Sequence, residues 1–140
     1  SNLEGFEYGH IFSSNSSASI IEKEVLAGIF GGYKRKTDWT GTSISTNWFE
    51  AKGKLEQLFN KLNLSVYWKA GLPKLYKGLL HPYRTSKLCL APGLALGIFG
   101  QINPILANKC SISPYLYLFE FNLEIIKTDY KYKKLLCIKD

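Results

Sequence analysis

The stretch LLHPYRTSKLCLAPGLALGIFGQINP, residues 79–104, decides how the middle of this chain folds. Within it, the runs Ser86–Pro92 and Leu94–Ile102 are mainly apolar and meet at Pro92-Gly93. Proline followed by glycine is typical of a type II turn, because the third position of that turn needs a positive φ. The two runs are therefore predicted to pair as an antiparallel hairpin.

Other segments of strand length lie on both sides of this hairpin. They are rich in aromatic and branched residues, which favours sheet. The predicted strands are Gly5–Phe12, Glu24–Tyr33, Leu64–Ala70 and Tyr115–Asn122. With the hairpin they predict an α+β fold, with a mainly antiparallel sheet of about six strands flanked by helices.

The clearest helix is predicted from Asn47 to about Leu62. Asn47 is suited to the N-cap, and Glu50 stands at the third helical position, as in a capping box. Gly53 costs about 1 kcal/mol relative to alanine inside a helix, which suggests close packing against the sheet. The predicted buried stripe contains residues 48, 49, 52, 55, 58, 59 and 62.

The remaining segments are predicted to be loops, with two short exceptions. Asn103 and Pro104 are suited to the cap and first position of a short helix that ends at Lys109. Residues 123–127 are predicted to form a single helical turn, followed by a basic end. The predicted loops are residues 13–19, 34–46 and 71–80.

Composition sets broad limits on the function. The chain has 140 residues, enough for one domain with a core, and its lack of methionine suggests a piece of a longer protein. No apolar run reaches the roughly 18 residues of a membrane-spanning helix. The net charge of +7 comes from 16 lysines and only 2 arginines, which favours a solvated basic surface over sequence-specific nucleic-acid recognition.

Three cysteines, Cys89, Cys110 and Cys137, are widely separated in the sequence. They match neither a disulfide framework nor zinc-ligand spacing. They are predicted to be reduced and mostly buried.

The segment His81-Pro82-Tyr83-Arg84 is the most suggestive candidate for chemistry. A catalytic histidine needs an orienting carboxylate and a nucleophile nearby. No carboxylate occurs between Glu56 and Glu120. His81, Pro82 and Arg84 are therefore predicted to end a loop and brace the hairpin that follows.

No catalytic, cofactor-binding or metal-binding site is predicted in this chain. GIFGG at residues 28–32 lacks the lysine and hydroxyl of a phosphate-binding loop. The acidic residues are not arranged with a histidine at ligand spacing. The acidic residues considered are Glu50, Glu56, Glu120 and Glu124.

Seven blocks, taken in order, resemble a known family. They are FEYGHIF, LAGIFGG, the tryptophan at position 39, NWFEAKGKLEQLF, LHPYRTSKL, LGIFGQINP and YLFEFNLE. They resemble successive blocks of the phenylalanyl-tRNA synthetase β subunit, of the bacterial and plastid type, from about Gly5 to Glu124. The sequence departs from the family pattern at His10, at Glu50–Gly53, at Tyr83 and at Asn103-Pro104.

The resemblance implies a place in a larger enzyme. Residues 1–126 would form the late, catalytic-like module of the β subunit, a class II synthetase-like core without catalytic motifs, and residues 127–140 a basic linker. In that family the α subunit activates phenylalanine with ATP, so ATP and magnesium are implied for the parent enzyme. Implied partners are the α subunit, in a heterotetramer, and tRNA, with no membrane. The implied location is the chloroplast stroma or the bacterial cytoplasm.

The predicted function is a non-catalytic structural module that supports the α subunit. Four aromatic residues are predicted to lie at or near that interface, because such residues dominate contact energy: Phe6, Tyr8, Trp39 and Trp48. The alternative is a small basic RNA-binding domain in which Lys131, Lys133 and Lys134 contact RNA. Its RNA affinity would fall steeply with salt.

Overall fold

A six-stranded antiparallel sheet forms the centre of the molecule, with strand order β1-β2-β8-β7-β6-β5. The computed structural model describes residues 5–14, 20–35 and 43–138, with side chains over 24–32 and 46–136. The sheet strands are β1 (Gly5–Ser14), β2 (Ile20–Gly31), β5 (Tyr67–Ala70), β6 (Leu80–Ala91), β7 (Leu94–Ile102) and β8 (Leu116–Asn122). The predicted α+β fold with a mainly antiparallel sheet is confirmed, while the class II likeness stays a prediction.

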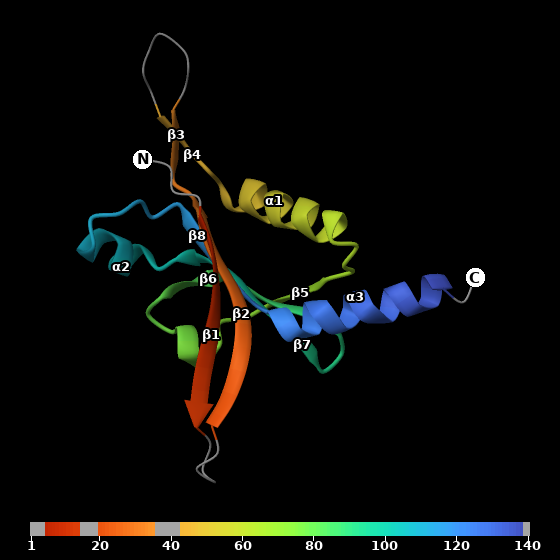
Figure 1. Cartoon of the computed structure of the whole chain (residues 1–140). Coiled ribbons are helices and arrows are strands. Elements are labelled where there is room, and N and C mark those ends of the chain that lie inside the picture. The colour runs from red at the N-terminus through yellow and green to blue at the C-terminus, as the bar shows by residue number, and fades with distance from the viewer. Residues whose placement is uncertain (1–4, 15–19, 36–42, 139–140) are drawn as a thin grey trace.

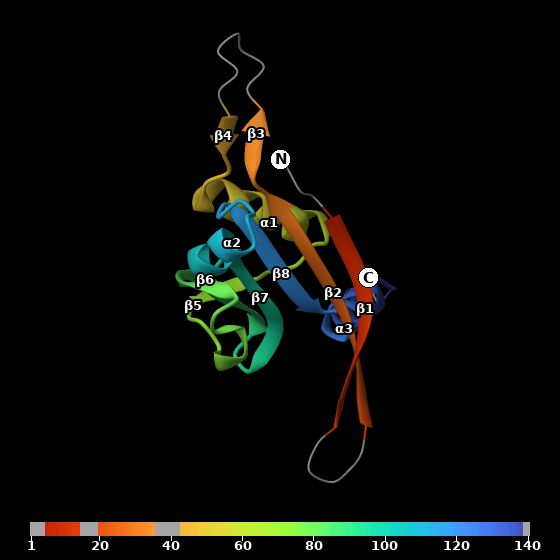
Figure 2. The same ribbon diagram turned by 90° about the vertical axis from the view of Figure 1, so that its left-hand side faces the viewer.

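The remaining elements flank this sheet. They are β3 (Tyr33–Arg35), β4 (Ser43–Ser45), α1 (Trp48–Lys61), the short 3-10 helix η1 (Lys74–Tyr76), α2 (Pro104–Lys109) and α3 (Leu123–Ile138). Helices α1 and α3 lie on one side of the sheet, and α2 lies on the other (Figure 1). Figure 2 looks onto the side of α2, where β2, β8 and β7 run next to one another. One face of the sheet is thus backed by long helices, and the other is less covered.

The predicted β6–β7 turn and the predicted starts of α1 and α2 are confirmed. Gly93 has φ of +78°, and Ala91 pairs with Leu94 across the β6–β7 turn. Asn47 caps α1, since its side-chain oxygen accepts the Glu50 N–H at 2.8 Å and its amide donates to the Glu50 carboxylate at 2.9 Å. The Asn103 side chain likewise accepts the Ile105 N–H at the start of α2.

An aromatic core joins α1 to the sheet. Phe99 on β7 is fully buried, and its ring stacks with Trp48 of α1 at a centroid distance of 5.2 Å. Helix α1 buries Ala51, Leu55 and Phe59 against the same layer. Burial of large apolar side chains is the main source of stability, at about 25 cal/mol per Å². The helix is therefore held by packing more than by its own propensity.

The predicted stripe of α1 is confirmed at its centre, where Leu55 and Phe59 are buried. It was wrong at two positions, because Phe49 is 79% exposed and Leu62 is 43% exposed, and it left out Ala51, which is fully buried. The close packing expected at Gly53 was also wrong, because a Cβ placed there meets no atom within 4 Å.

Other predicted boundaries were also wrong. β6 begins at Leu80, six residues before the expected Ser86. The expected loop over residues 34–46 contains part of β3 and all of β4, which pair from Tyr33↔Ser45 to Arg35↔Ser43, although residues 36–42 lie outside the described part. Helix α3 has 16 residues, not one turn, and it crosses the predicted module boundary at residue 126. The assignment of 127–140 as an interdomain linker stays a prediction.

Gly97 on β7 has no room for a side chain beside β8. A Cβ at this position would lie 1.9 Å from the backbone oxygen of Glu120 and 3.0 Å from the Cα of Phe121. Both neighbouring atoms belong to the backbone of the central strand, so they cannot move aside as a flexible side chain would. The pairing of these strands therefore requires glycine here.

We expect Gly97→Ala to lower the free energy of unfolding by about 1–3 kcal/mol or more, because the new methyl group forces the central strands apart. The matched control is Gly53→Ala, which has open space and should raise stability by up to about 1 kcal/mol through helix propensity. Urea denaturation of both variants checks this. Equal stability of Gly97→Ala and the wild type would show that the strands separate without cost.

Candidate functional site

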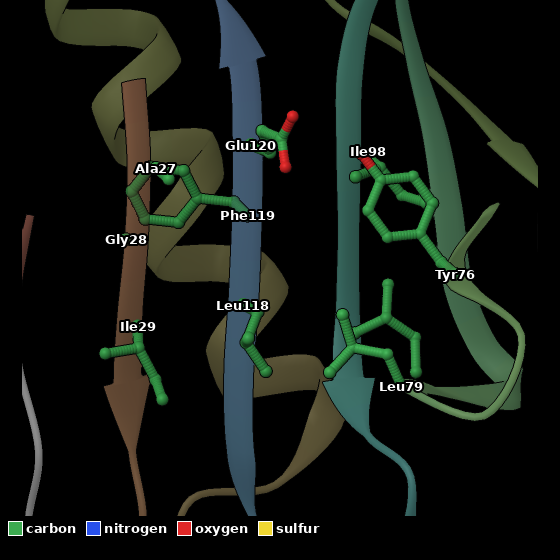
Figure 3. A pocket seen from close by; sticks show the side chains of 10 residues that line it. Ala27, Gly28, Ile29, Tyr76, Leu79, Ile98, Leu118, Phe119 and Glu120 are labelled. Carbon is green, nitrogen blue, oxygen red and sulfur yellow. The ribbon is translucent and has the colours of Figure 1, made fainter. Parts of the chain in front are cut away.

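The less covered face of the sheet carries a pocket of about 360 Å³. Its floor is formed by Ala27 and Ile29 of β2, Leu118 of β8 and Ile98 of β7, and its wall by Tyr76 and Leu79 (Figure 3). Ala27 pairs with Glu120, and Glu120 pairs with Ile98. Directly paired residues of antiparallel strands point to the same face, so the register places Glu120 among apolar neighbours.

Glu120 and Tyr76 are the two groups in this pocket that can ionise. The phenol of Tyr76 reaches across Ile98 toward Glu120 (Figure 3). Burial raises the pKa of Tyr76 to about 12, and the charge of the Glu120 carboxylate and its hydrogen bond with Tyr76 add to the rise. A phenol is protonated at neutral pH, so Tyr76, which points toward Glu120, can donate to the carboxylate. The pair can hold a cation or a hydrogen-bond donor in apolar surroundings.

Sequence reasoning named Glu120 among the acidic residues but did not place Tyr76 beside it. The available signal was a single carboxylate in the apolar strand YLYLFEFN, since a charge at a half-buried sheet position calls for a partner. Tyr76 comes from a segment 44 residues earlier, predicted only as a loop. Pairing the two needed the strand order, which periodicity does not give.

His81, Pro82 and Arg84 lie in the first half of β6, between the pairing of Leu80 and that of Thr85 with β7, where the register shifts. The Nδ1 atom of His81 accepts the Tyr83 N–H at 3.0 Å, and its carbonyl accepts the Thr85 hydroxyl at 2.5 Å. Partial burial lowers the pKa of His81, and the positive charge of Arg84 lowers it further. These contacts hold the irregular start of the strand.

Arg84 links three segments near the start of α1. Its guanidinium donates to the side-chain oxygen of Gln101 at 3.0 Å, and the Gln101 amide donates to the carbonyl of Pro114 at 2.6 Å. Arg84 on β6 is thereby tied to Gln101 on β7, and its predicted role as a brace of the hairpin stays a prediction. Gln101 is 2% exposed, so its two hydrogen bonds satisfy a polar group that would otherwise be costly to bury.

Tyr117 closes the same end of the core. Its hydroxyl donates to the carbonyl of Thr46, just before α1, at 2.8 Å. Burial raises the pKa of Tyr117 to about 12, although the charge of Arg84 acts in the opposite direction. The residue therefore serves as a buried hydrogen-bond donor that anchors the start of the helix.

The predicted interface aromatics are not brought together as one described surface. Trp48 is half-buried and packs on Phe99 and Tyr117. Phe6 and Tyr8 lie on β1, paired with Gly28 and Leu26, in a segment whose side chains are outside the description. Trp39 lies outside the described residues. The interface role of these four residues stays a prediction.

The predicted RNA-contact lysines lie on α3 and divide into two groups. Lys131 and Lys134 line a groove of about 410 Å³ between α3 and the end of α1. Lys133 instead pairs with Asp129 at 3.0 Å and donates to the carbonyl of Asn63. One of the three lysines is thus engaged within the molecule, and RNA contact by them stays a prediction.

The remaining sequence expectations concern cysteines, metals and membranes. Cys110 is exposed and Cys89 is half-buried, so the prediction of mostly buried cysteines was wrong for Cys110, while the side chain of Cys137 is outside the description. Over the described residues, no three His, Cys, Asp or Glu side chains are grouped to hold a metal ion. No helix in that part of the chain is long and apolar enough to span a membrane.

The fold and site define a single antiparallel-sheet module with a helix-packed face and a pocket on the other. The family model described as the phenylalanyl tRNA synthetase beta chain CLM domain matches residues 1–123. The chain belongs to this family.

Curated relatives agree with this assignment. The chain is 48% identical over 133 residues to the chloroplastic phenylalanine–tRNA ligase beta subunit of Phaeodactylum tricornutum, covering 95% of this chain and 19% of that protein. It is 37% identical over 127 residues to the phenylalanine–tRNA ligase beta subunit of Thermosynechococcus vestitus, covering 89% of this chain and 15% of the relative. The chain thus spans less than a fifth of the length of these relatives.

We expect the stability advantage of the wild type over Tyr76→Phe to shrink as the pH rises from about 10 toward 12. In this window the unfolded chain ionises Tyr76, whose ordinary pKa is 10.0, while the folded chain keeps it protonated. Unfolding therefore releases a proton, and the stabilisation present below pH 10 is lost as the pH rises.

Urea denaturation at pH 9, 10 and 11 measures this difference. Tyr83→Phe, at a position 90% exposed, is the control for the loss of a phenol in general. A constant difference between the wild type and Tyr76→Phe across the three pH values would contradict the raised pKa of Tyr76 in the folded chain.

Proposed function

We propose that this chain is a non-catalytic structural module of the β subunit of phenylalanine–tRNA ligase. In this proposal it supports the α subunit, which attaches phenylalanine to its tRNA at the expense of ATP. The observation that carries the proposal is the family match over residues 1–123, which contains α1 and all six strands of the sheet. A match of that extent concerns the whole packed unit and not an isolated motif.

The charges around the pocket on the less covered sheet face favour a non-catalytic role. ATP carries several negative charges, and sites for its phosphates are built from cations, metal ions or helix N-termini. The ten residues that line the described pocket include no lysine, arginine or histidine, and their only carboxylate is Glu120. This residue set does not fit a triphosphate. We therefore propose that ATP and magnesium act elsewhere in the parent enzyme.

The exposed apolar residues of α3 favour a structural role in which this helix contacts another part of a larger assembly. Tyr130, Tyr132 and Leu135 are 65%, 61% and 60% exposed on a helix that extends away from the sheet (Figure 1). Aromatic and aliphatic residues of this kind supply most of the energy at protein interfaces. Tyr132 and Leu135 are three positions apart and therefore lie on one side of the helix. We propose that a neighbouring part of the ligase, the α subunit included, covers that side of α3.

The proposed setting follows from the relatives. One is chloroplastic and others belong to cyanobacterial strains, so a plastid stroma or a bacterial cytoplasm is the proposed location. The heterotetramer and tRNA are proposed partners of the parent enzyme.

The test uses the complete β subunit co-expressed with its α subunit. We expect Gly97→Ala to reduce the yield of assembled complex, measured by size-exclusion chromatography, and to reduce aminoacylation in proportion. The rate per assembled complex should stay within about twofold of the wild type, because the module contributes assembly and not chemistry. Gly53→Ala is the control, and it should leave both quantities unchanged.

Glu120→Gln separates the structural role from a catalytic one. We expect the assembled complex with this substitution to keep its rate of phenylalanine-dependent ATP–pyrophosphate exchange within about twofold. A fully assembled complex whose exchange rate fell by a factor of about 100 or more would place Glu120 in the chemistry and overturn the proposal.

A further inference from the structure

The pocket on the open sheet face has the size and composition of a small-ligand site. Its volume of about 360 Å³ lies within the range of roughly 300–1,000 Å³ that is usual for such sites. The floor is aliphatic, with Ala27, Ile29, Ile98 and Leu118 contributed by three neighbouring strands. A rigid sheet holds these side chains in place, so the surface is formed before any ligand arrives.

The one charged side chain among the residues that line this pocket is the carboxylate of Glu120. Glu120 is half-buried, and among the pocket's ten lining residues, all of them in the described part of the chain, there is no basic side chain. Lys87, which follows Ile98 in the same cross-strand row, is exposed and does not line the pocket. A carboxylate in apolar surroundings is stabilised most by a cation that also makes a hydrogen bond.

Tyr76 lies beside the carboxylate without saturating it. Its phenol points toward Glu120 and can donate one hydrogen bond, whereas a carboxylate has about four acceptor positions on its two oxygens (Figure 3). Within the described part of the chain this leaves positions for a further donor, and the aliphatic floor lies beside them.

We propose that this pocket binds a small organic ammonium ion with an aliphatic body. Glu120 accepts hydrogen bonds from the ammonium group, Tyr76 holds the carboxylate in position, and the hydrocarbon lies on Ala27, Ile98 and Leu118. Anions and nucleotides are excluded by the charge of Glu120, and neutral alcohols lose the ion pair. The inference goes beyond the proposed structural function and does not depend on it.

The probes are hexylammonium, hexan-1-ol and hexanoate, which share a carbon chain and differ in the charge of the head group. Binding is measured by amide chemical shifts of the 140-residue chain. We expect hexylammonium to shift the amides of Ala27, Ile98 and Glu120 with a dissociation constant on the order of 1 mM. Hexan-1-ol should bind at least about tenfold more weakly, and hexanoate should leave these amides unchanged, because a charge-assisted hydrogen bond is lost or becomes a repulsion.

Substitutions assign the binding to the pocket. Glu120→Gln should weaken hexylammonium binding by about tenfold or more, while Tyr76→Phe, which keeps the charge, should change it by about threefold or less. The matched control is Glu56→Gln, an exposed carboxylate on α1 at the other face, which should leave binding unchanged. The amide spectrum of each free variant confirms that it is folded.

Several results would overturn the proposal. Binding of hexan-1-ol as tight as that of hexylammonium would show an apolar surface without charge recognition. Equal weakening by Glu56→Gln and Glu120→Gln would show general attraction to surface charge. No shift at 20 mM hexylammonium would exclude a small ammonium ligand, even if a basic side chain of a partner subunit later proved to occupy the pocket.

Discussion

The arrangement of helix and sheet depends on the contacts of the Phe99 ring, which is fully buried. It stacks with Trp48 of α1 and meets Trp68 of β5 edge-on, at centroid distances of 5.2 and 5.8 Å. It also stacks with Phe30 of β2 and Tyr117 of β8, at 6.0 Å in each case. Each such pair contributes about 0.5–1.5 kcal/mol beyond the burial of its surface. One side chain of β7 thereby connects α1 with strands β2, β5 and β8.

This packing makes the two faces of the sheet different. The helix side is filled by aromatic rings, and Lys52 completes it by lying over Trp48 and Trp68, with its amino group 5.9 and 5.0 Å from their ring centroids. Such cation–π contacts add about 0.5–1 kcal/mol at exposed sites. The other side keeps a pocket with one carboxylate. The sheet thus packs on one face and remains accessible on the other.

Local chemistry explains which parts of the fold could be predicted from the sequence. The Pro92-Gly93 turn, the Asn47 cap and the Asn103-Pro104 start each depend on a few adjacent residues, and each was predicted correctly. The strand order could not be predicted in this way, because β8 lies between β2 and β7 through contacts distant in sequence. The α1 stripe was predicted correctly at Leu55 and Phe59 but not at Phe49, which fits helical spacing and is nevertheless exposed.

The candidate site shows the same limit. His81 and Arg84 lie in the first half of β6, and their assignment to a non-catalytic role, made from the shortage of nearby carboxylates, stays a prediction. The pairing of Tyr76 with Glu120 was missed, because the two residues are far apart in sequence and meet only in the folded chain. Helix α3 was shortened in the prediction because its lysines and tyrosines carry little amphipathic signal, and its length shows that propensity outweighed pattern there.

Replacing Phe99 by alanine is the most direct test of the central claim that its ring joins helix and sheet into one cooperative unit. The measurement is urea unfolding of Phe99→Ala beside Phe49→Ala, followed by tryptophan fluorescence and far-ultraviolet circular dichroism. A loss of about 3–5 kcal/mol is predicted for Phe99→Ala. Phe49→Ala should stay within about 0.5 kcal/mol of the wild type, whose two probes should give coincident transitions. Similar small losses for both variants, or separate transitions in the wild type, would contradict the claim.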